Sequence, residues 1–146
     1  MKNSKLLGTV LVLMLSTSAL AEKWDMPTPY GDGNHPTQVA RQFAEEVTAK
    51  SGDKLEITVH SGGSLIKHPE IHRAVKSRQV QLGEVFVGRL GNNDPIFKLD
   101  NIPFLATDFD SAEKLYKLSK PELSKQLAKD GLMLLYTVPW PPQDLY

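Results

Sequence analysis

The sequence contains no cysteine among its 146 residues. Disulfides and zinc sites built from thiolates are therefore excluded, and the chain must hold its fold by packing alone. It also lacks an excess of either charge, because 17 basic residues balance 17 acidic ones. A face basic enough for nucleic acid is not expected, and the charge balance does not suggest membrane binding. We predict no nucleic-acid partner.

Short motifs of common enzyme classes are missing as well. The segment Gly62-Gly-Ser-Leu65 lacks the second glycine of a G-x-S-x-G nucleophile turn, and neither the phosphate loop nor the dinucleotide fingerprint occurs. A cysteine nucleophile is excluded by composition. The sequence thus assigns no catalytic residue and no cofactor, and we expect a protein that is not an enzyme.

One alternative is an exported metal-dependent hydrolase that uses His68 and His72. In the zinc-protease helix a glutamate directly follows the first histidine, whereas Glu70 here comes two residues after His68. Pro69 also disfavours a helical conformation at His68. We interpret the pair as a cap histidine and a surface histidine with no metal. Stoichiometric zinc in an elemental analysis would favour the hydrolase instead.

The apolar run of the chain lies at its start. Two lysines and the apolar residues 6–15 precede Ala-Leu-Ala at 19–21, the small-x-small pattern that signal peptidase reads. A spanning helix needs about 20 apolar residues, and this stretch is shorter and interrupted by hydroxyl residues. We predict a signal peptide over 1–21, cleavage before Glu22 and a periplasmic location. The mature chain would carry 15 basic and 17 acidic residues, a net charge of −2.

Downstream, the hydrophobic periodicity alternates between the strand and the helix type. Strands are predicted over 22–26, 54–60, 80–87 and 133–138. Helices are predicted from a cap near Asn34 to Lys50, over 69–78, over 110–118 behind a capping box at Asp110 and Glu113, and over 121–130. Strands that alternate with helices across short connections indicate an α/β fold with a mainly parallel sheet flanked by helices.

Loops beyond the carboxyl ends of these strands are candidates for a binding site, because open α/β sheets bind ligands there. Three stretches qualify, at 28–35, 61–67 and 86–89. The glycine loop in the second allows close approach of the backbone, and its successive N–H groups could cradle an anion. Arg89, Lys67 and His35 could add positive charge.

The order of motifs resembles the solute receptors of tripartite ATP-independent periplasmic (TRAP) transporters, the dicarboxylate-binding-protein type. The resemblance covers essentially all of residues 22–146. The matching stretches are Tyr30-Gly-Asp-Gly-Asn-His35, Phe43-Ala-Glu-Glu-Val47, Leu55-Glu-Ile-Thr-Val59, Ser61-Gly-Gly-Ser-Leu65, Pro69-Glu-Ile71, Val80-Gln-Leu-Gly-Glu84, Asp94-Pro-Ile-Phe97, Ile102-Pro-Phe-Leu105 and Trp140-Pro-Pro-Gln143.

The resemblance implies a type II periplasmic-binding-protein-like fold of two α/β domains that close on an organic acid. The receptor, expected to be a monomer when complete, would hand this ligand to a membrane permease. Residues 22–138 would form the first domain and 139–146 the start of the segment that crosses to the second. The arginine that pairs with the ligand carboxylate would lie beyond residue 146. We therefore expect a truncated form whose half-cleft binds very weakly, or else a remnant that binds nothing.

The family's ligand contacts in its first domain can be carried over by position. They fall on Pro27, Thr28, Tyr30, Asn34, His35, Gly63, Ser64, Phe86, Arg89 and Trp140. Two departures matter: Arg78 stands at a helix end where relatives often have glycine, and Gly88 lacks a side chain where a polar contact is expected. The sequence does not identify which organic acid is bound.

Overall fold

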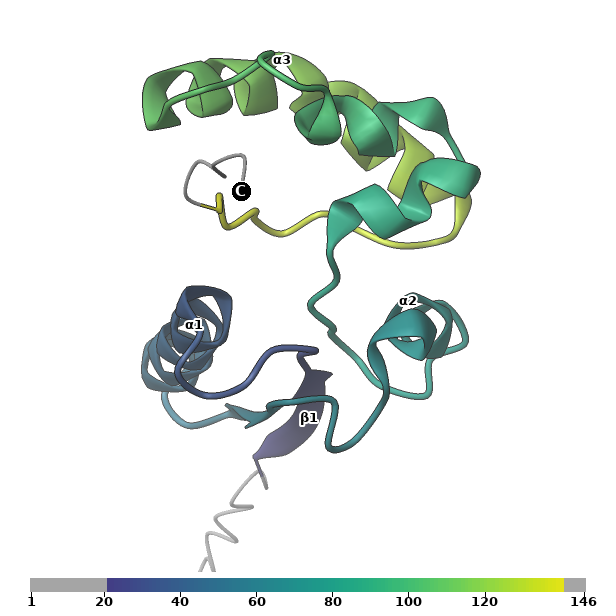
Figure 1. Cartoon of the computed structure of the whole chain (residues 1–146). Helices are drawn as coiled ribbons and strands as arrows, with labels where there is room; N and C mark the ends of the chain where they lie inside the picture. The colour runs from purple at the N-terminus through teal and green to yellow at the C-terminus, as the bar shows by residue number, and fades with distance from the viewer. Residues whose placement is uncertain (1–20, 141–146) are drawn as a thin grey trace, which may run out of the picture.

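The computed structural model describes residues 21–140, which form two layers (Figure 1). Most of the predicted signal peptide and residues 141–146 lie outside this range. One layer contains β1 (Glu22–Pro27), α1 (His35–Ser51), β2 (Leu55–His60) and α2 (His68–Lys76). The other contains the 3₁₀ helices η1 (Val87–Asn92) and η2 (Pro95–Asn101) and the helix α3 (Phe109–Lys129). Across this range, none of the helices has the length and apolarity needed to cross a membrane.

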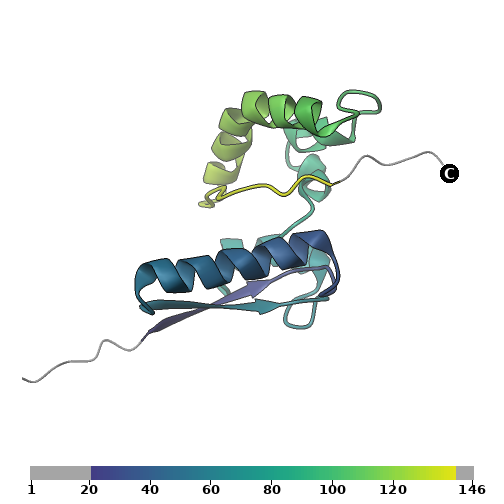
Figure 2. The ribbon, with the colours of Figure 1, turned by 90° about the vertical axis from the view of Figure 1, so that its left-hand side faces the viewer.

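The sheet consists of β1 and β2, which pair in parallel with Trp24 opposite Ile57. Helix α1 makes the connection between them and packs on the sheet (Figure 2). It begins as predicted, with Asn34 as an extended N-cap and a proline in the first turn, and ends at Gly52 in the left-handed region (φ 65°). The first strand, the second strand and the helix between them are confirmed.

The prediction of a third strand over 80–87 is wrong. The segment runs beside β1 but shares little of its hydrogen-bonding pattern: the Glu84 N–H donates to the Pro27 carbonyl (3.0 Å). Two residues earlier in β1, the Asp25 N–H donates to the Gln81 side-chain oxygen (3.0 Å). In a β-ladder the acceptor would be a backbone carbonyl. The apolar pattern predicted a strand, but the segment is half-buried apart from the buried Val80 and the exposed Gln81, and a strand also requires a continuous backbone ladder.

The prediction of a fourth strand over 133–138 is also wrong, because no backbone hydrogen bond joins this segment to another described element. Its side chains nevertheless alternate. Met133 and Leu135 are exposed, whereas Leu134 packs on the apolar cluster of the second layer. Tyr136 lies against Phe43 of α1, with ring centroids 5.1 Å apart. The segment is thus extended and crosses back toward the first layer.

Helix α3 replaces the two helices predicted over 110–118 and 121–130. Pro121 lies within it, and its ring removes one N–H donor without ending the helix. The bend of α3 in Figure 2 has this proline as its physical cause. The predicted capping box at Asp110 is wrong by two positions. The structure places it at Asp108, whose carboxylate accepts from the Ser111 N–H (2.7 Å), while the Ser111 hydroxyl accepts from the Asp108 N–H (3.3 Å).

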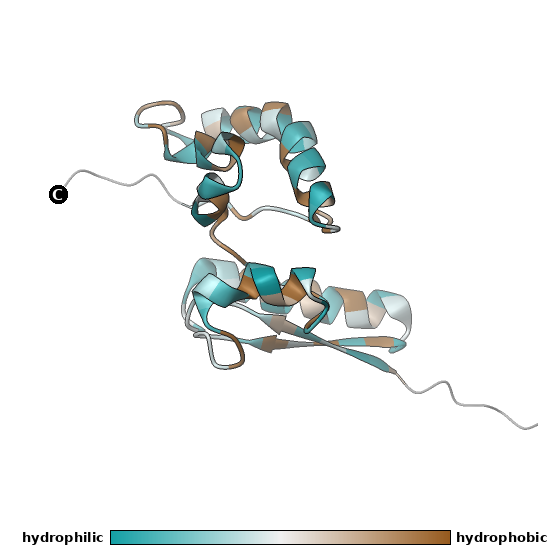
Figure 3. Ribbon diagram, turned by 90° about the vertical axis from the view of Figure 1, so that its right-hand side faces the viewer, coloured by the Kyte–Doolittle hydropathy of each residue, from teal (hydrophilic) through white to brown (hydrophobic). Residues whose placement is uncertain are grey.

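Three small apolar clusters stabilise the part of the chain at residues 21–140. The first joins α1 to the sheet, the second joins α2 to the 80–85 segment, and the third joins η1, η2 and α3. Val85 contacts both the second and the third cluster, and the link between the two layers is correspondingly apolar (brown in Figure 3). This apolar link is one of the contacts between the layers, beside the Tyr136–Phe43 contact and the ion pairs of Asp130.

Close approaches of the backbone fix two glycines in this link. A Cβ on Gly83 would lie 2.6 Å from Ile71 Cγ2 of α2, and one on Gly88 would lie 2.2 Å from Asn101 Nδ2. The contact at Gly83 is with the fully buried Ile71, so a side chain there would disturb the packing on α2, whereas the Asn101 side chain that meets Gly88 is exposed.

Arg78 follows α2 with a positive φ of 60°, a conformation that favours glycine. We predict that Arg78→Gly stabilises the protein by about 1 kcal/mol, because the left-handed conformation is unfavourable for a residue with a Cβ. Urea unfolding would measure this. The matched control is Arg73→Gly inside α2, which should destabilise by about 1 kcal/mol. A lower midpoint for the Arg78 variant would contradict the prediction.

Candidate functional site

The loop after β1 is held by a buried pair of hydroxyl groups. Thr28 and Thr37 are fully buried, and their Oγ1 atoms lie 3.3 Å apart. The Thr37 hydroxyl also donates to the Tyr30 carbonyl (3.0 Å), and the Tyr30 N–H donates to Thr28 Oγ1 (3.3 Å). These bonds attach the loop to the first turn of α1. They fix the position of Tyr30, whereas Thr28 and the equally buried Pro27 present no side-chain surface to solvent.

The glycine loop after β2 packs against the same segment. The Gly62 N–H donates to the Tyr30 carbonyl (2.7 Å) and the Gly63 N–H to the Thr28 carbonyl (2.9 Å), while the Ser64 N–H donates to Ser61 (3.1 Å). Both glycines adopt a positive φ, which explains the residue type. The predicted anion cradle is wrong in this conformation, because all three N–H groups already have acceptors. Ligand contact by Gly63 or the exposed Ser64 remains a prediction.

Tyr30 is the centre of an aromatic group that we call the Tyr30 cluster: Tyr30, His68 and Trp140. The Tyr30 ring meets His68 edge-on at 6.0 Å and Trp140 edge-on at 5.1 Å between centroids. Burial raises the pKa of Tyr30, the Glu84 carboxylate raises it further, and the exposed Arg89 guanidinium opposes this. Three segments far apart in the sequence therefore meet in one aromatic wall with a cation beside it.

His68 supports the segment that carries Phe86. It begins α2, and its Nε2 accepts from the Phe86 N–H (3.3 Å). Burial lowers the pKa of His68, and the charge of Arg89 lowers it further, so the neutral acceptor form is favoured. His72 instead lies 3.3 Å from the Asp130 carboxylate. The two histidines thus have different partners, and within residues 21–140 no three His, Asp or Glu side chains are grouped to hold a metal.

Glu84 and Tyr136 are the residues of this region that the sequence did not suggest as site residues. Glu84 is largely buried. Its Oε2 is shielded from solvent and has no hydrogen-bond partner among the described residues. Burial raises the pKa of Glu84, and the Thr28 hydroxyl beside it opposes the rise. Burial, together with the Glu84 charge, raises the pKa of Tyr136 to about 12. A charged residue inside an apolar extended segment was the available signal for Glu84.

Most predicted site residues gather around the end of β1. Backbone contacts join Pro27, Thr28, Tyr30 and Gly63. Phe86 is connected to this group through its hydrogen bond to His68, and Trp140 through its ring contact with Tyr30. Asn34 and His35 are exposed at the start of α1, and no described contact joins their side chains to the Tyr30 cluster. The arrangement presents an aromatic surface with Arg89 as the nearby cation.

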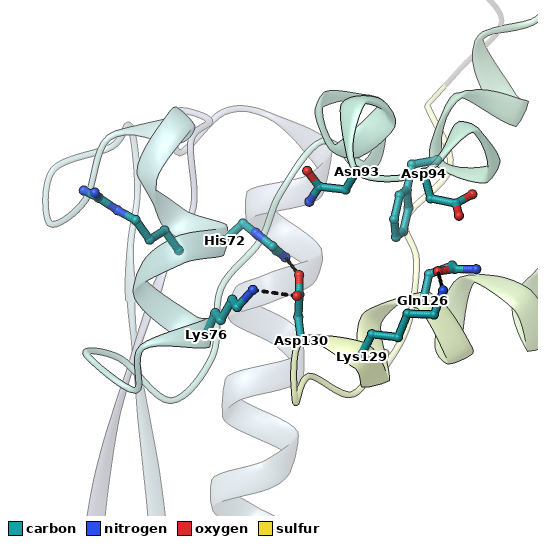
Figure 4. Close-up of a pocket in the computed structure, with 9 residues that line it drawn as sticks. His72, Lys76, Asn93, Asp94, Gln126, Lys129 and Asp130 are labelled. Carbon is teal, nitrogen blue, oxygen red and sulfur yellow. Dashed lines mark hydrogen bonds and ion pairs between the residues drawn. The ribbon is translucent and has the colours of Figure 1, made fainter.

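A cavity lies elsewhere, between α2 and the end of α3, with a volume of about 410 Å³ (Figure 4). Two lysines have partners within its lining: Asp130 Oδ1 lies 2.6 Å from Lys76 Nζ, and Lys129 donates to Gln126. His72 Nε2, also in the lining, is buried without a hydrogen-bond partner among the described residues. None of the predicted site residues lines this cavity. We therefore interpret it as a junction between the layers and place the candidate site at the Tyr30 cluster.

The family model described as bacterial extracellular solute-binding protein, family 7 (DctP) matches residues 30–140. The chain belongs to this family of extracytoplasmic solute-binding proteins.

Among solved structures, DctP6 of Bordetella pertussis, an extracytoplasmic solute receptor binding pyroglutamic acid, is 49% identical with a TM-score of 0.81. A marine metagenome TRAP solute-binding protein specific for pyroglutamate is 45% identical, also with a TM-score of 0.81. Each alignment covers 83% of this chain and 40% of the other. The C4-dicarboxylate-binding protein DctB of Bacillus subtilis is 32% identical over 75 residues, which is 51% of this chain and 21% of that protein. The predicted fold class, an α/β domain of the type II periplasmic-binding-protein kind, is confirmed, and the chain spans about 40% of the solved relatives.

Asp130 connects the layers, and its ion pairs give a pH dependence. The Lys76 hydrogen bond, with His72 nearby, holds the pKa of Asp130 below its usual value. A lowered folded pKa contributes stability above the unfolded pKa of about 3.9 and loses it as pH falls through the folded value. We predict that Asp130→Asn costs about 0.5–1 kcal/mol at pH 7, since the pair is partly exposed, and almost nothing near pH 2–3.

Urea unfolding at pH 7 and at pH 2–3 would test this expectation. Asp53→Asn is the control, because Asp53 is exposed in a turn and asparagine tolerates its positive φ of 59°. The same loss at both pH values for the Asp130 variant would contradict the ion-pair account.

Proposed function

We propose that this chain is part of a TRAP solute receptor that binds a small organic acid of the pyroglutamate type and delivers it to a membrane permease. The observation that supports this most strongly is the 45–49% identity to receptors whose bound acid is pyroglutamate. Family membership supports a binding function, and the proposed role involves no chemical change to the ligand. Residues 22–138 would act as the first domain.

The proposed binding surface is the Tyr30 cluster together with Arg89. Trp140 is 42% exposed and lies edge-on to Tyr30, so it can cover a flat ring without unfolding. Arg89 is exposed near Tyr30 and can attract the carboxylate. A ring with one carboxylate, such as pyroglutamate, fits aromatic walls beside a single cation.

Export is part of the proposal. We infer that a signal peptide is removed after Ala21, which leaves Glu22 as the first residue of the mature chain. Support comes from the fold, because β1 starts at Glu22 and cleavage there would leave the strand intact. Mass spectrometry of the exported protein would report the mature N-terminus.

Ligand-observed NMR with L-pyroglutamate tests the binding proposal, because it detects affinities as weak as millimolar. We predict binding by the chain, and a loss of about fivefold or more for Trp140→Ala, because one aromatic wall is removed. Phe104→Ala is the matched control, since Phe104 is 83% exposed and belongs to no described apolar cluster. Absence of pyroglutamate binding, or equal losses in both variants, would contradict the proposed site.

A further inference from the structure

Glu84 is held in place by its backbone. Its N–H donates to the Pro27 carbonyl at the end of β1 (3.0 Å), and the preceding Gly83 packs so tightly on α2 that a Cβ would overlap Ile71. The carboxylate therefore projects from a fixed point. It lies beside the Thr28 hydroxyl and close enough to Tyr30 and Tyr136 to act on both phenols.

The carboxylate of Glu84 lacks the partners that a buried acid normally has. Among the described residues, no lysine, arginine or histidine forms an ion pair with it. Oε2 has neither solvent nor a hydrogen-bond donor. Buried carboxylates are normally paired or hydrogen-bonded, because an unpaired one is unfavourable. Glu84 therefore has capacity for one donor that this part of the chain does not supply.

We propose that Glu84 determines ligand specificity by accepting a hydrogen bond from a ring or amide N–H of the ligand and by excluding ligands with a second carboxylate. This inference rests on the proposed function. Pyroglutamate carries one carboxylate and one neutral lactam N–H, so it can face Arg89 with the first and Glu84 with the second. Because Oε2 is shielded from solvent in this structure, binding requires a local rearrangement that makes it accessible.

The same carboxylate disfavours a C4-dicarboxylate. The second negative group of such a ligand would approach Glu84 in a poorly solvated site, where like charges repel strongly. A ligand without a donor, even one of the same shape, would leave the Glu84 oxygen unpaired. Glu84 thus discriminates by charge against dicarboxylates and by hydrogen bonding against donor-free rings.

Three ligands separate these effects: L-pyroglutamate, its lactone analogue 5-oxotetrahydrofuran-2-carboxylate, in which an oxygen replaces the N–H, and succinate. The unchanged chain should bind pyroglutamate about tenfold or more tightly than the lactone, and succinate more weakly still, as a hydrogen bond to a charged group predicts. Glu84→Gln should weaken pyroglutamate binding about tenfold and lower the lactam-to-lactone ratio, because its neutral amide oxygen accepts a weaker hydrogen bond than a carboxylate does.

Controls distinguish specificity from folding. Glu45→Gln makes the same chemical change at an exposed position on α1 and should leave every affinity unchanged. Circular dichroism would show whether Glu84→Gln is folded. If it is not, the lactam-to-lactone ratio of the unchanged chain still tests the inference.

Three results would overturn it. Equal affinities of the unchanged chain for lactam and lactone would remove the role of Glu84 and leave the proposed function standing. The same holds for a folded Glu84→Gln that keeps the original ratio. No binding of pyroglutamate by the unchanged chain would overturn both the proposed function and this inference.

Discussion

The hydrogen bond from the Glu84 N–H to the Pro27 carbonyl links the parts of this molecule on which the site depends. It attaches the 80–86 segment to the end of β1, the strand that pairs with β2. Gly83 then allows the segment to lie directly on α2, and Val85 continues into the apolar cluster of the second layer. This connection thus positions the acid, and the hydrogen bonds of Thr28 and Thr37 position Tyr30 beside it.

Around this connection the backbone uses its own polar groups, and this limits how a ligand can be held. The carbonyls of Thr28 and Tyr30 accept from the glycine loop, and the Phe86 N–H donates to His68. These backbone groups are therefore not available to an anion in this conformation. The proposed recognition relies instead on side chains, namely the Tyr30 cluster, Arg89 and Glu84.

Local sequence was sufficient for the elements that are stabilised locally. The first two strands and the helix between them follow from alternation, the Asn34 cap and the Gly52 stop. The third and fourth strands were wrong because an apolar pattern reports burial, whereas a strand also needs a backbone partner. Pro121 was overvalued as a helix breaker, since packing of Leu123 and Leu127 in the third cluster offsets one lost hydrogen bond.

The candidate site was also predictable only in part, because local patterns locate loops but do not encode contacts between distant segments. Loops at the carboxyl ends of strands are found from element order, and they located Tyr30 and Arg89. The roles of Glu84, His68 and Tyr136 depend on contacts between distant segments, which no local pattern encodes. Glu84 involves both local sequence and distant contacts, because a charged residue is unusual in an apolar segment and its partners come from other segments. A charged residue persists in an apolar segment where function compensates for its cost, so a single acid there can indicate a binding site.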